Sequence, residues 1–446
     1  MVFSRRRLQS GMYLTAVVCA ALALSACGSS SGGSSGGGSS APAAHFNPNA
    51  KIRGQHITVL LPYAVPQSIL NQFTQQTGVK LTYVTAGWDN VKSKLIVANT
   101  AGTYIADVTE FDWSFTGQFG GSGWYVPLES GLGPQLISDL GNVNKAFDTN
   151  GHTYAACYSN DYRLSLYNKK DFAAAGITSW PTTFSQLDSV LATLKAKHAA
   201  PYPMSLPLGA TEGGLTPWYL TTLAMGGQLF DAHNKPVFGQ PNSTASKALE
   251  WEIQALKKGW ISPGSVTLDD TPAANNFNAG EAAILYASGP GPLATANDPS
   301  QSKIAGNAAA GLMPGMNGPG SSFGLPEGLA IPVTAQHKDA ALAFIKWWLE
   351  PKTQEEMYTT GSVGFLPCSL RALKLLSKSG KLEDGQVLQA ELSHIVPLFP
   401  QGAPVWYSKF DTRAQQLINA AAKGEMTPSN ALSQLASYTS TLASGG

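Results

Sequence analysis

The amino-acid sequence predicts an α/β protein with two lobes, each built around a doubly wound sheet. The chain has 446 residues, of which 43% are hydrophobic, and it is too long for one ordinary core. Strand-like and helical stretches alternate along residues 57–110, which is typical of a parallel sheet covered by helices. Residues 151–187 change from strand to polar break and back to strand, which indicates a crossing between two lobes.

The first lobe begins with short apolar runs separated by helical stretches. A continuous apolar run predicts a buried strand. Gly78 is suited to end the helix after the first strand, because glycine readily adopts the left-handed conformation of a helix C-terminus. The predicted strands are 57–61, 80–85 and 104–110, and the predicted helices are 67–77 and 91–100.

Aromatic and acidic residues follow each of these strands. Tyr63 follows the first strand and Trp88 follows the second. Asp112 and Trp113 follow the third strand. Because ligands of open α/β sheets bind at the carboxyl ends of the strands, these four side chains are candidate ligand contacts.

The crossing stretch contains two β-prone runs around a polar patch. Residues 152–158 and 162–167 are predicted strands, and the patch between them is Ser159-Asn160-Asp161. Helices are predicted over 169–175 and 183–197, the second with Thr182 or Thr183 as its N-cap. A strand interrupted by a polar patch is expected to form a hinge.

The second half of the chain continues the alternation. A loop over 209–214 leads to a helix with Trp218 predicted at its head, and a strand over 283–287 runs into Ser288-Gly289-Pro290-Gly291. The helix over 339–350 is strongly apolar, so its Trp347 and Trp348 are predicted to lie in the core.

Several motifs, in this order and at these spacings, resemble one family over about residues 55–435. The longest is the crossing stretch, which reads G-x-x-Y, then L-x-Y-N-K-x-x-F-x-x-A-G-I, then P-T-T-F-x-Q-L. Shorter ones are ADV at 106–108, GWYVPL at 123–128, NFNAGEAA at 276–283, GLAIP at 328–332 and AALAFI at 340–345. The sequence resembles the extracellular solute-binding proteins of bacterial ABC importers, in the sugar and oligosaccharide branch that includes maltose-binding protein.

The resemblance implies a periplasmic-binding-protein-like fold, in which two lobes are joined by a three-segment hinge and a ligand cleft lies between them. The return crossings are then expected within 321–332 and 361–368. The implied boundaries are 51–157 with 327–365 for lobe 1, 162–323 with 369–446 for lobe 2, and 158–161, 324–326 and 366–368 for the hinge.

The resemblance also implies a saccharide ligand. Saccharide hydroxyls pair with carboxylates and amides, and the apolar C–H faces lie on aromatic rings. Many relatives carry a tryptophan where this chain has Gly291, so one stacking platform is missing and the choice of sugar is expected to differ. The expected ligand contacts are Tyr63, Trp88, Asp112, Trp113, Tyr158, Asn160, Asp161, Trp218, Phe323, Glu327 and Trp406.

The first 50 residues predict export and a lipid anchor. Residues 1–27 combine a basic start, an apolar run over 12–24 and the ending Leu24-Ser25-Ala26-Cys27, which looks like a lipoprotein signal with Cys27 lipidated. The alternatives are an ordinary cleaved signal and an uncleaved single span, although the apolar run is shorter than the roughly 20 residues of a span. Both Sec and twin-arginine export fit the arginines at 5–7. Residues 28–50, rich in Gly and Ser, are expected to form a flexible tether.

Two cysteines remain for the folded part of the chain. Cys19 leaves with the signal and Cys27 takes the lipid, which leaves Cys157 and Cys368. Both lie in expected hinge crossings, which run side by side in a three-segment hinge. A disulfide between them can persist outside the membrane, and two buried free thiols are the alternative.

The composition argues against several other functions. The net charge is +1, only 13% of residues are charged and no Lys/Arg cluster follows Arg7, so nucleic-acid binding is not expected. The chain lacks G-x-S-x-G, H-E-x-x-H, C-x-x-C and Walker A motifs, and its seven His have no metal-ligand spacing. We therefore expect no enzyme activity, no cofactor and no metal.

The expected function is that of a membrane-tethered, monomeric lipoprotein outside the bacterial cytoplasmic membrane. It would bind a carbohydrate by hinge closure and deliver it to the transmembrane subunits of an ABC permease. Three alternatives stay open. They are a binding protein for a non-sugar solute such as a polyamine, glycerophosphodiester or metal chelate, a secreted glycosidase, and a sensor accessory.

Overall fold

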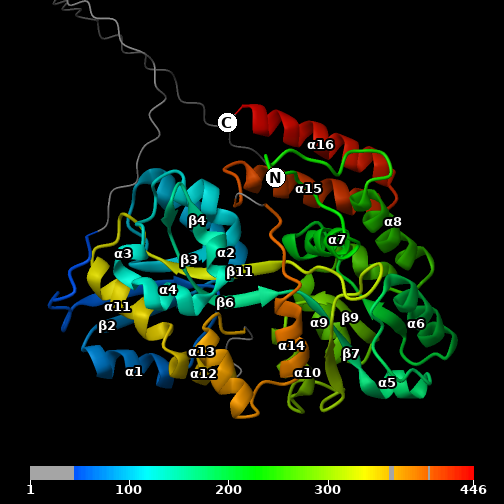
Figure 1. Cartoon of the computed structure of the whole chain (residues 1–446), viewed down its shortest axis with the longest axis horizontal. Helices are drawn as coiled ribbons and strands as arrows, with labels where there is room; N and C mark the ends of the chain where they lie inside the picture. The colour runs from blue at the N-terminus through cyan, green and yellow to red at the C-terminus, as the bar shows by residue number, and fades with distance from the viewer. Residues whose placement is uncertain (1–44, 361–365, 400–401, 446) are drawn as a thin grey trace, which may run out of the picture. The chain divides into compact units, whose positions relative to one another are not determined.

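The computed structural model describes residues 45–360, 366–399 and 402–445. Within them, two larger sheets organise the chain (Figure 1). The first has the strand order β2-β1-β3-β11-β6, and the second has the order β10-β7-β9-β8. A short two-stranded sheet pairs β4 (Asp148–Thr149) with β5 (His152–Thr153). The prediction of an α/β fold with two sheets is confirmed.

The first sheet starts with the predicted strand and helix alternation. Strands β1 (His56–Leu61), β2 (Lys80–Thr85) and β3 (Val108–Asp112) are parallel. The connecting helices are α1 (Gln67–Thr77) and α2 (Trp88–Ala101), which end at glycines in the left-handed conformation. The third strand spans 108–112 instead of the predicted 104–110, so Asp112 is its last residue and does not follow it.

Strand β11 (Gly324–Ala330) adds an antiparallel neighbour to the parallel strands that the sequence predicts. It lies between β3 and β6 (Ala156–Tyr162) and runs antiparallel to both. The prediction came from strands that are neighbours in sequence, whereas β11 returns to this sheet from the second one and enters it from the opposite end. Only tertiary structure sets its direction.

The second sheet is also mixed. Strand β7 (Leu164–Asn168) is antiparallel to β9 (Ala282–Ser288) and to β10 (Ala308–Gly311), and only β8 (Tyr202–Ser205) is parallel to β9. Its helices are α5 (Lys169–Ala174), α6 (Phe184–Ala196), α7 (Glu212–Ala224), α8 (Thr244–Lys257), α9 (Asp270–Asn278) and α10 (Gly291–Asn297).

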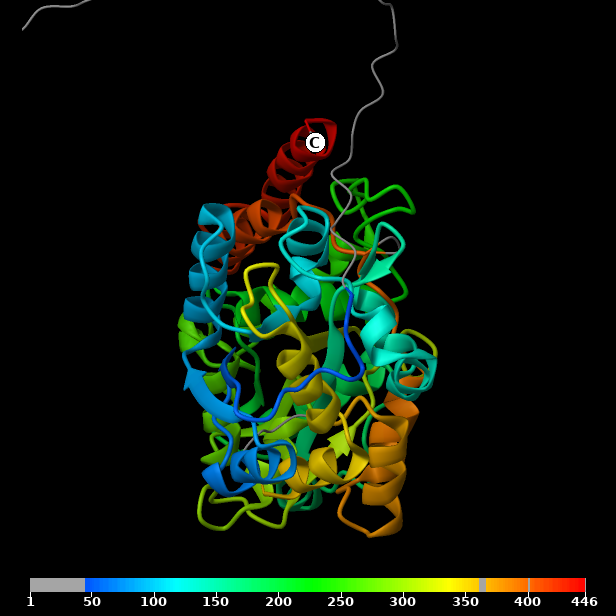
Figure 2. The same cartoon turned by 90° about the vertical axis from the view of Figure 1, so that its left-hand side faces the viewer.

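The remaining helices pack around both sheets. The C-terminal helices α15 and α16 contact each other and lie beside α7 and α8 (Figures 1 and 2). No helix among the described residues has the length and apolar character needed to span a bilayer. The helices that pack around the two sheets are α3 (Glu129–Leu132), α4 (Pro134–Leu140), α11 (Lys338–Trp348), α12 (Pro351–Thr359), α13 (Leu370–Lys378), α14 (Gly385–Leu392), α15 (Tyr407–Ala422) and α16 (Pro428–Ser444). The shorter helical turns are the 3-10 helices Trp113–Phe115, Asn142–Phe147 and Pro263–Thr267 and the π-helix Thr116–Gly120.

Three segments connect the two sheets at one place. In the β6–β11 pair, Asn160 lies opposite Pro326, and the backbone N–H of Asn160 donates to the carbonyl of Leu366 at 2.8 Å. A disulfide joins Cys157 to Cys368, with 5.8 Å between their Cα atoms. The segments 158–161, 324–326 and 366–368 therefore lie side by side. The predicted lobe boundaries stay a prediction, and residues 361–365 of the third crossing lie outside the described residues.

The hydrophobic core contains the two tryptophans of α11. Trp347 is 3% exposed and Trp348 is fully buried, so their predicted place in the core is confirmed. Trp348 stacks against Tyr83 with 6.4 Å between the rings and meets Tyr158 edge-on. This packing holds α11 against β2 and β6 of the first sheet.

Candidate ligand-binding site

Two connected cavities lie between the sheets. The first, here called the Trp88 cavity, has a volume of about 370 Å³, and the second, the α9–α10 cavity, has a volume of about 330 Å³. Both volumes fall within the range of small-molecule sites. The cavities share Tyr63, Asp161, Arg163, Gly213, Asp270, Thr271 and Glu327, so together they form one continuous site.

The Trp88 cavity is built where the strands of the first sheet end. Tyr63 follows β1, Trp88 is the first residue of α2, and Asp112 ends β3 with Trp113 directly after it. The opposite wall comes from the second half of the chain. It consists of Thr211, Glu212, Gly213 and Thr216 around the start of α7 and Asp269, Asp270 and Thr271 at the start of α9.

Glu327 and Tyr63 form a short hydrogen bond at the junction of the two cavities. The Tyr63 hydroxyl donates to Glu327 Oε1 at 2.5 Å, and Glu327 is 5% exposed. Burial raises the pKa of Glu327 from its usual 4.5 to about 8. The Glu327 carboxyl is therefore mostly protonated at neutral pH, and it can donate a hydrogen bond to a ligand oxygen as well as accept one.

Asp112 has a different environment at the end of β3. Its Oδ1 accepts the backbone N–H of Ser114 at 2.8 Å. Burial raises the pKa of Asp112 to about 6, although hydrogen bonds from Ser114 and the positive charge of Lys92 lower it. At neutral pH Asp112 is therefore mostly ionised and offers acceptor oxygens to the hydroxyls of a ligand.

Asp161 forms an ion pair with a residue that the sequence analysis missed. The Nη2 atom of Arg163 donates to Asp161 Oδ2 at 2.8 Å, and Arg163 is only 9% exposed. Arg163 lies between β6 and β7, two residues beyond the polar patch of the crossing. The presence of a single cationic residue next to that patch is the sequence feature that could have identified Arg163 as a site residue. A Cβ added to Gly289 would lie 2.1 Å from Asp161 Oδ1, so only glycine leaves room for this carboxylate.

Lys92 brings the two walls of the Trp88 cavity together electrostatically. Its ammonium lies 4.8 Å from the centre of the Trp88 ring, 3.9 Å from Glu212 Oε2 and 3.7 Å from Asp411 Oδ2. The lysine comes from α2, whereas both acids belong to helices of the other half, α7 and α15. Ionic attraction therefore favours the approach of the two halves, whereas the cation–π contact lies within α2 and holds the Lys92 ammonium over the Trp88 ring.

Two of the expected ligand contacts are wrong because their side chains are buried in the core. Trp218 is fully buried, and its indole N–H donates to the carbonyl of Ala245 at 2.9 Å. Helix α7 begins at Glu212, so Trp218 lies well inside the helix and not at its head. Tyr158 is also fully buried and donates to Glu110 Oε2 at 2.6 Å.

The three residues of the polar patch lie on opposite faces of β6, because side chains alternate along a strand. Ser159 and Asp161 line the α9–α10 cavity, whereas Asn160 lines a separate groove on the other side of β6 together with Phe323. The expected ligand contacts of Asn160 and Phe323 are therefore not at this site.

Trp406 is likewise placed away from both cavities. It packs among Phe230, Phe399 and Phe410, with 5.9, 6.0 and 6.2 Å between ring centres. Its side chain is 9% exposed and lines neither cavity. The prediction that Trp406 stacks on the ligand is corrected, because this aromatic cluster takes up its ring.

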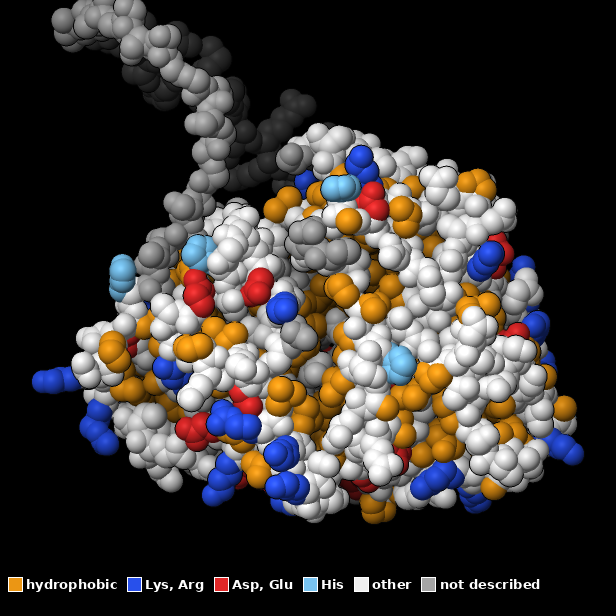
Figure 3. Space-filling model, viewed as in Figure 1, with side chains coloured by type: hydrophobic (Ala, Val, Ile, Leu, Met, Phe, Trp, Pro, Cys, Tyr) orange, Lys and Arg blue, Asp and Glu red, His pale blue; other side chains and the backbone are white. Residues whose placement is uncertain are grey.

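The separate groove is apolar and has a volume of about 720 Å³. Figure 3 shows hydrophobic side chains gathered around the hollow in the middle of this face. Trp113 lines both this groove and the Trp88 cavity, and it contacts Phe323 edge-on at 5.0 Å. The other groove residues include Leu140, Leu373, Leu392, Ile395 and Leu398.

The described residues contain no group of three or more His, Cys, Asp or Glu side chains placed to hold a metal ion. The site instead combines aromatic rings, carboxyl groups and one guanidinium on walls from both sheets. This fold and this site define a two-lobed ligand-binding protein.

The comparisons with known proteins identify the family. The model of the bacterial extracellular solute-binding proteins matches residues 60–355, and the chain belongs to this family. A mannitol-binding protein of Pseudomonas aeruginosa is 27% identical over 333 residues, covering 70% of this chain and 75% of the relative. A probable amino-acid ABC transporter periplasmic-binding protein of Sinorhizobium fredii is 24% identical over 319 residues, covering 69% and 70%.

Solved structures share the fold. The ABC transporter solute-binding protein of Thermotoga lettingae bound with α-D-tagatose has a TM-score of 0.77 at 20% identity, covering 87% of this chain and all of that one. The solute-binding protein of Agrobacterium radiobacter in complex with ribitol has a TM-score of 0.77 at 21% identity, covering 88% and 99%. The predicted periplasmic-binding-protein-like fold is confirmed.

Proposed function

We propose that this protein binds an uncharged sugar or polyol in the cleft between its lobes and delivers it to an ABC permease. The supporting observation is that aromatic rings and acceptor groups from both halves of the chain meet in one cavity: Trp88, Trp113 and Asp112 from one side, and Glu212 and the start of α9 from the other. A relative named as a mannitol-binding protein supports this ligand class, and so do the two similar structures that were solved with bound tagatose and ribitol.

The proposed mechanism is closure around the ligand. Contacts made on both walls at once favour the closed form, because the ligand binds that form more tightly than the open one. Lys92 adds contacts across the same cavity before any ligand enters. The three side-by-side crossing segments are the proposed hinge, and the permease is the proposed recipient of the closed, loaded protein.

The proposed location is the outer face of the cytoplasmic membrane. Lipidation of Cys27 would anchor the chain there, and residues 28–50 would tether the folded part. Cys27 and residues 28–44 lie outside the described residues, which begin at residue 45. Metabolic labelling with a fatty acid, compared with a Cys27→Ala variant, tests the anchor, and loss of label in the variant alone is expected.

Thermal unfolding tests the ligand class. A ligand at 100 times its dissociation constant adds about 2.7 kcal/mol to the free energy of unfolding, so a true ligand should raise the melting temperature clearly. The screen contains D-mannitol, ribitol, D-tagatose, D-glucose and common disaccharides. The absence of a shift with every sugar and polyol would contradict the proposal.

Trp88→Ala should weaken binding of the responding sugar by about 10-fold or more. The half-buried ring lines the cavity, and an aromatic contact contributes about 0.5–1.5 kcal/mol in addition to its buried area. Isothermal titration calorimetry measures the change. Trp124→Ala is the matched control, because Trp124 is also half-buried but packs on Phe119 and lines neither cavity. Equal losses in both variants would remove Trp88 from the site.

A cationic solute is the second candidate, and one observation favours it. Six carboxyl groups line the two cavities, whereas Arg163 is the one guanidinium or ammonium side chain that lines them among the described residues. Such a lining attracts positive charge. Adding spermidine and L-arginine to the same screen separates the candidates, because a cationic ligand would bind more weakly as the salt concentration rises. The carboxyl groups are Asp112, Asp161, Glu212, Asp269, Asp270 and Glu327.

A further inference from the structure

We propose that Lys92 is a specificity-determining residue: its ammonium group occupies, beside the Trp88 cavity, the position that a cationic ligand would take, and so restricts the site to uncharged ligands. The inference rests on the proposed function and decides between the two candidate ligand classes. Lys92 then acts as a cation that is built into the protein.

The Lys92 ammonium lies in a cage of aromatic rings and carboxylates. The ring centres of Trp88 and Phe115 are 4.8 and 6.0 Å away from it, and these two rings contact each other. Carboxylate oxygens of Glu212 and Asp411 are 3.9 and 3.7 Å away. Aromatic faces and carboxylates are the groups that bind alkylammonium ions in proteins. The cage therefore matches a primary ammonium group, and the protein fills it with its own.

The carboxylates of this cage need a positive partner. The side chain of Asp411 is only 2% exposed, and that of Lys92 is 14% exposed. A buried carboxylate is strongly unfavourable without a cation nearby, because it has lost its hydration. Burial also raises the pKa of Asp112, and the charge of Lys92 opposes this effect. Without the lysine, the cage would hold negative charge that an external cation could neutralise.

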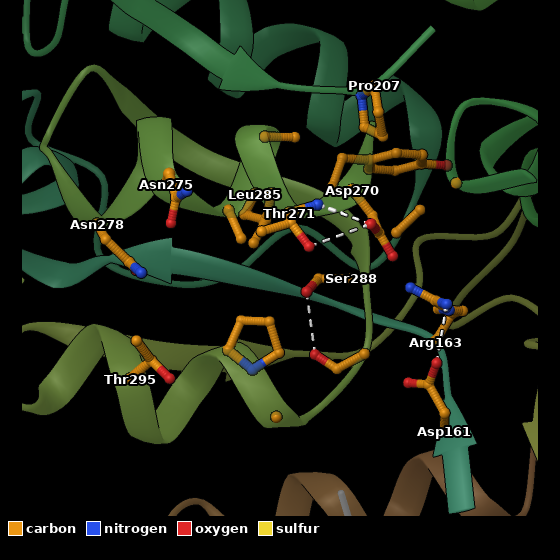
Figure 4. Close-up of a pocket in the computed structure, with 18 of the residues that line it drawn as sticks. Asp161, Arg163, Pro207, Asp270, Thr271, Asn275, Asn278, Leu285, Ser288 and Thr295 are labelled. Carbon is orange, nitrogen blue, oxygen red and sulfur yellow. Dashed lines mark hydrogen bonds and ion pairs between the residues drawn. The ribbon is translucent and has the colours of Figure 1, made fainter. Parts of the chain in front are cut away.

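The other carboxyl groups of the two cavities are also stabilised from within the protein. Asp161 pairs with Arg163 at 2.8 Å, and Figure 4 shows the guanidinium facing this carboxylate. Asp269 and Asp270 accept backbone N–H groups at the start of α9, where the positive end of the helix stabilises negative charge. Glu327 is mostly protonated at neutral pH, because burial raises its pKa to about 8. This internal compensation favours an uncharged ligand.

Chemical rescue of Lys92→Ala tests the inference without any sugar. The substitution removes the part of the side chain that corresponds to n-propylammonium. It also joins the emptied cage to the cavity, because Trp88 and Glu212 border both. The melting temperature should fall below that of the wild type and rise again with n-propylammonium chloride, but not with n-propanol or sodium chloride at the same concentration. An equal rise with either control compound, or no rise with n-propylammonium, would overturn the inference.

Lys94→Ala is the matched control for the rescue. Lys94 is an exposed lysine of the same helix, α2, so its removal changes the net charge by the same amount. Neither this variant nor the wild type should respond to n-propylammonium chloride more than to sodium chloride. A response of Lys94→Ala as large as that of Lys92→Ala would show unspecific binding of the cation and would contradict the cage.

Lys92→Met supplies a second measurement that does not depend on the folding of Lys92→Ala. Methionine is a flexible side chain that fills much of the same space without a charge. A cation in the Trp88 cavity then lies beside Glu212 and Asp112 without repulsion from the lysine. Isothermal titration calorimetry should show spermidine binding at least about 10-fold more tightly to Lys92→Met than to the wild type, and Lys94→Met should behave like the wild type. Equal affinities of Lys92→Met and the wild type would show that Lys92 does not set the specificity.

The inference and the proposed function can fail separately. If no sugar or polyol raises the melting temperature of the wild type, the proposed function is wrong, and the rescue with n-propylammonium still decides whether the cage binds an ammonium group. If a sugar or polyol binds the wild type and spermidine binds it as tightly as it binds Lys92→Met, the inference is wrong and the proposed function stands.

Discussion

Replacing both Cys157 and Cys368 with alanine is expected to lower the free energy of unfolding by about 5 kcal/mol. The disulfide links residues 211 positions apart, and closing a loop of that length restricts the unfolded chain by about this amount in the loop-entropy description. Denaturant unfolding followed by tryptophan fluorescence measures the change. The same loss is expected when the wild-type protein is unfolded in the presence of a reductant.

The double alanine variant also serves as the control for effects of the reductant that do not involve the disulfide. Its unfolding curve should be the same with and without reductant, whereas the wild-type curve should shift to lower denaturant. Equal midpoints for all four curves would show that the bond between β6 and the third crossing does not stabilise the fold. Alanine is chosen because both positions are buried and a free thiol would remain reactive.

Glu252→Gln should stabilise the protein by an amount that grows with pH. Glu252 is fully buried in α8, accepts the Thr221 hydroxyl at 2.9 Å, and has a pKa raised by burial from 4.5 to about 8. In the unfolded chain Glu252 loses its proton above about pH 4.5, whereas the folded protein retains it up to about pH 8. Unfolding therefore releases a proton in this window, and Glu252 lowers stability as pH rises.

Glutamine imitates the protonated carboxyl group and removes this dependence. The variant and the wild type should be similar near pH 4.5, and the variant should be more stable by on the order of 4 kcal/mol at pH 8. Urea unfolding at a series of pH values measures the difference. Glu250→Gln, an exposed position on the same helix, should follow the wild-type profile. A constant difference between Glu252→Gln and the wild type at all pH values would contradict the assignment.

The candidate site was partly predictable from strand ends. Tyr63, Trp88, Asp112 and Trp113 were expected to meet because the carboxyl ends of parallel strands share one edge, and in the structure all four line the same cavity. Asp161 and Glu327 also line it, at the junction with the second cavity. Whether these residues bind the ligand stays a prediction until binding is measured.

The errors in the expected site have identifiable causes. Trp218 was placed at a helix head because the glycines before it resemble a loop, but the Thr211 side chain caps the helix and α7 starts earlier. Tyr158 and Asn160 were taken together with Asp161 although adjacent residues of a strand face opposite ways. Trp406 was assigned by resemblance alone, and neighbouring phenylalanines take up its ring.

The missed residues share a different cause. Arg163 is more than 100 positions away from Asp270 and Asn278, which both belong to α9. No local pattern reveals that α9 faces Arg163 across the cavity. Arg163 matters because β6 and β7 place it beside Asp161 and next to both cavities. Asn278 matters because packing leaves its oxygen buried without a partner.

The sequence by itself determined the local elements, the family and the positions at which strands end in polar and aromatic residues. Helix α1 and strand β2 have the predicted bounds, because hydrophobic spacing and glycine stops act over a few neighbouring residues. Only the tertiary structure decided the direction of β11, the burial of Trp218 and Trp406, and the second cavity beside α10. These depend on contacts between segments that are remote in the chain, and no local pattern contains them.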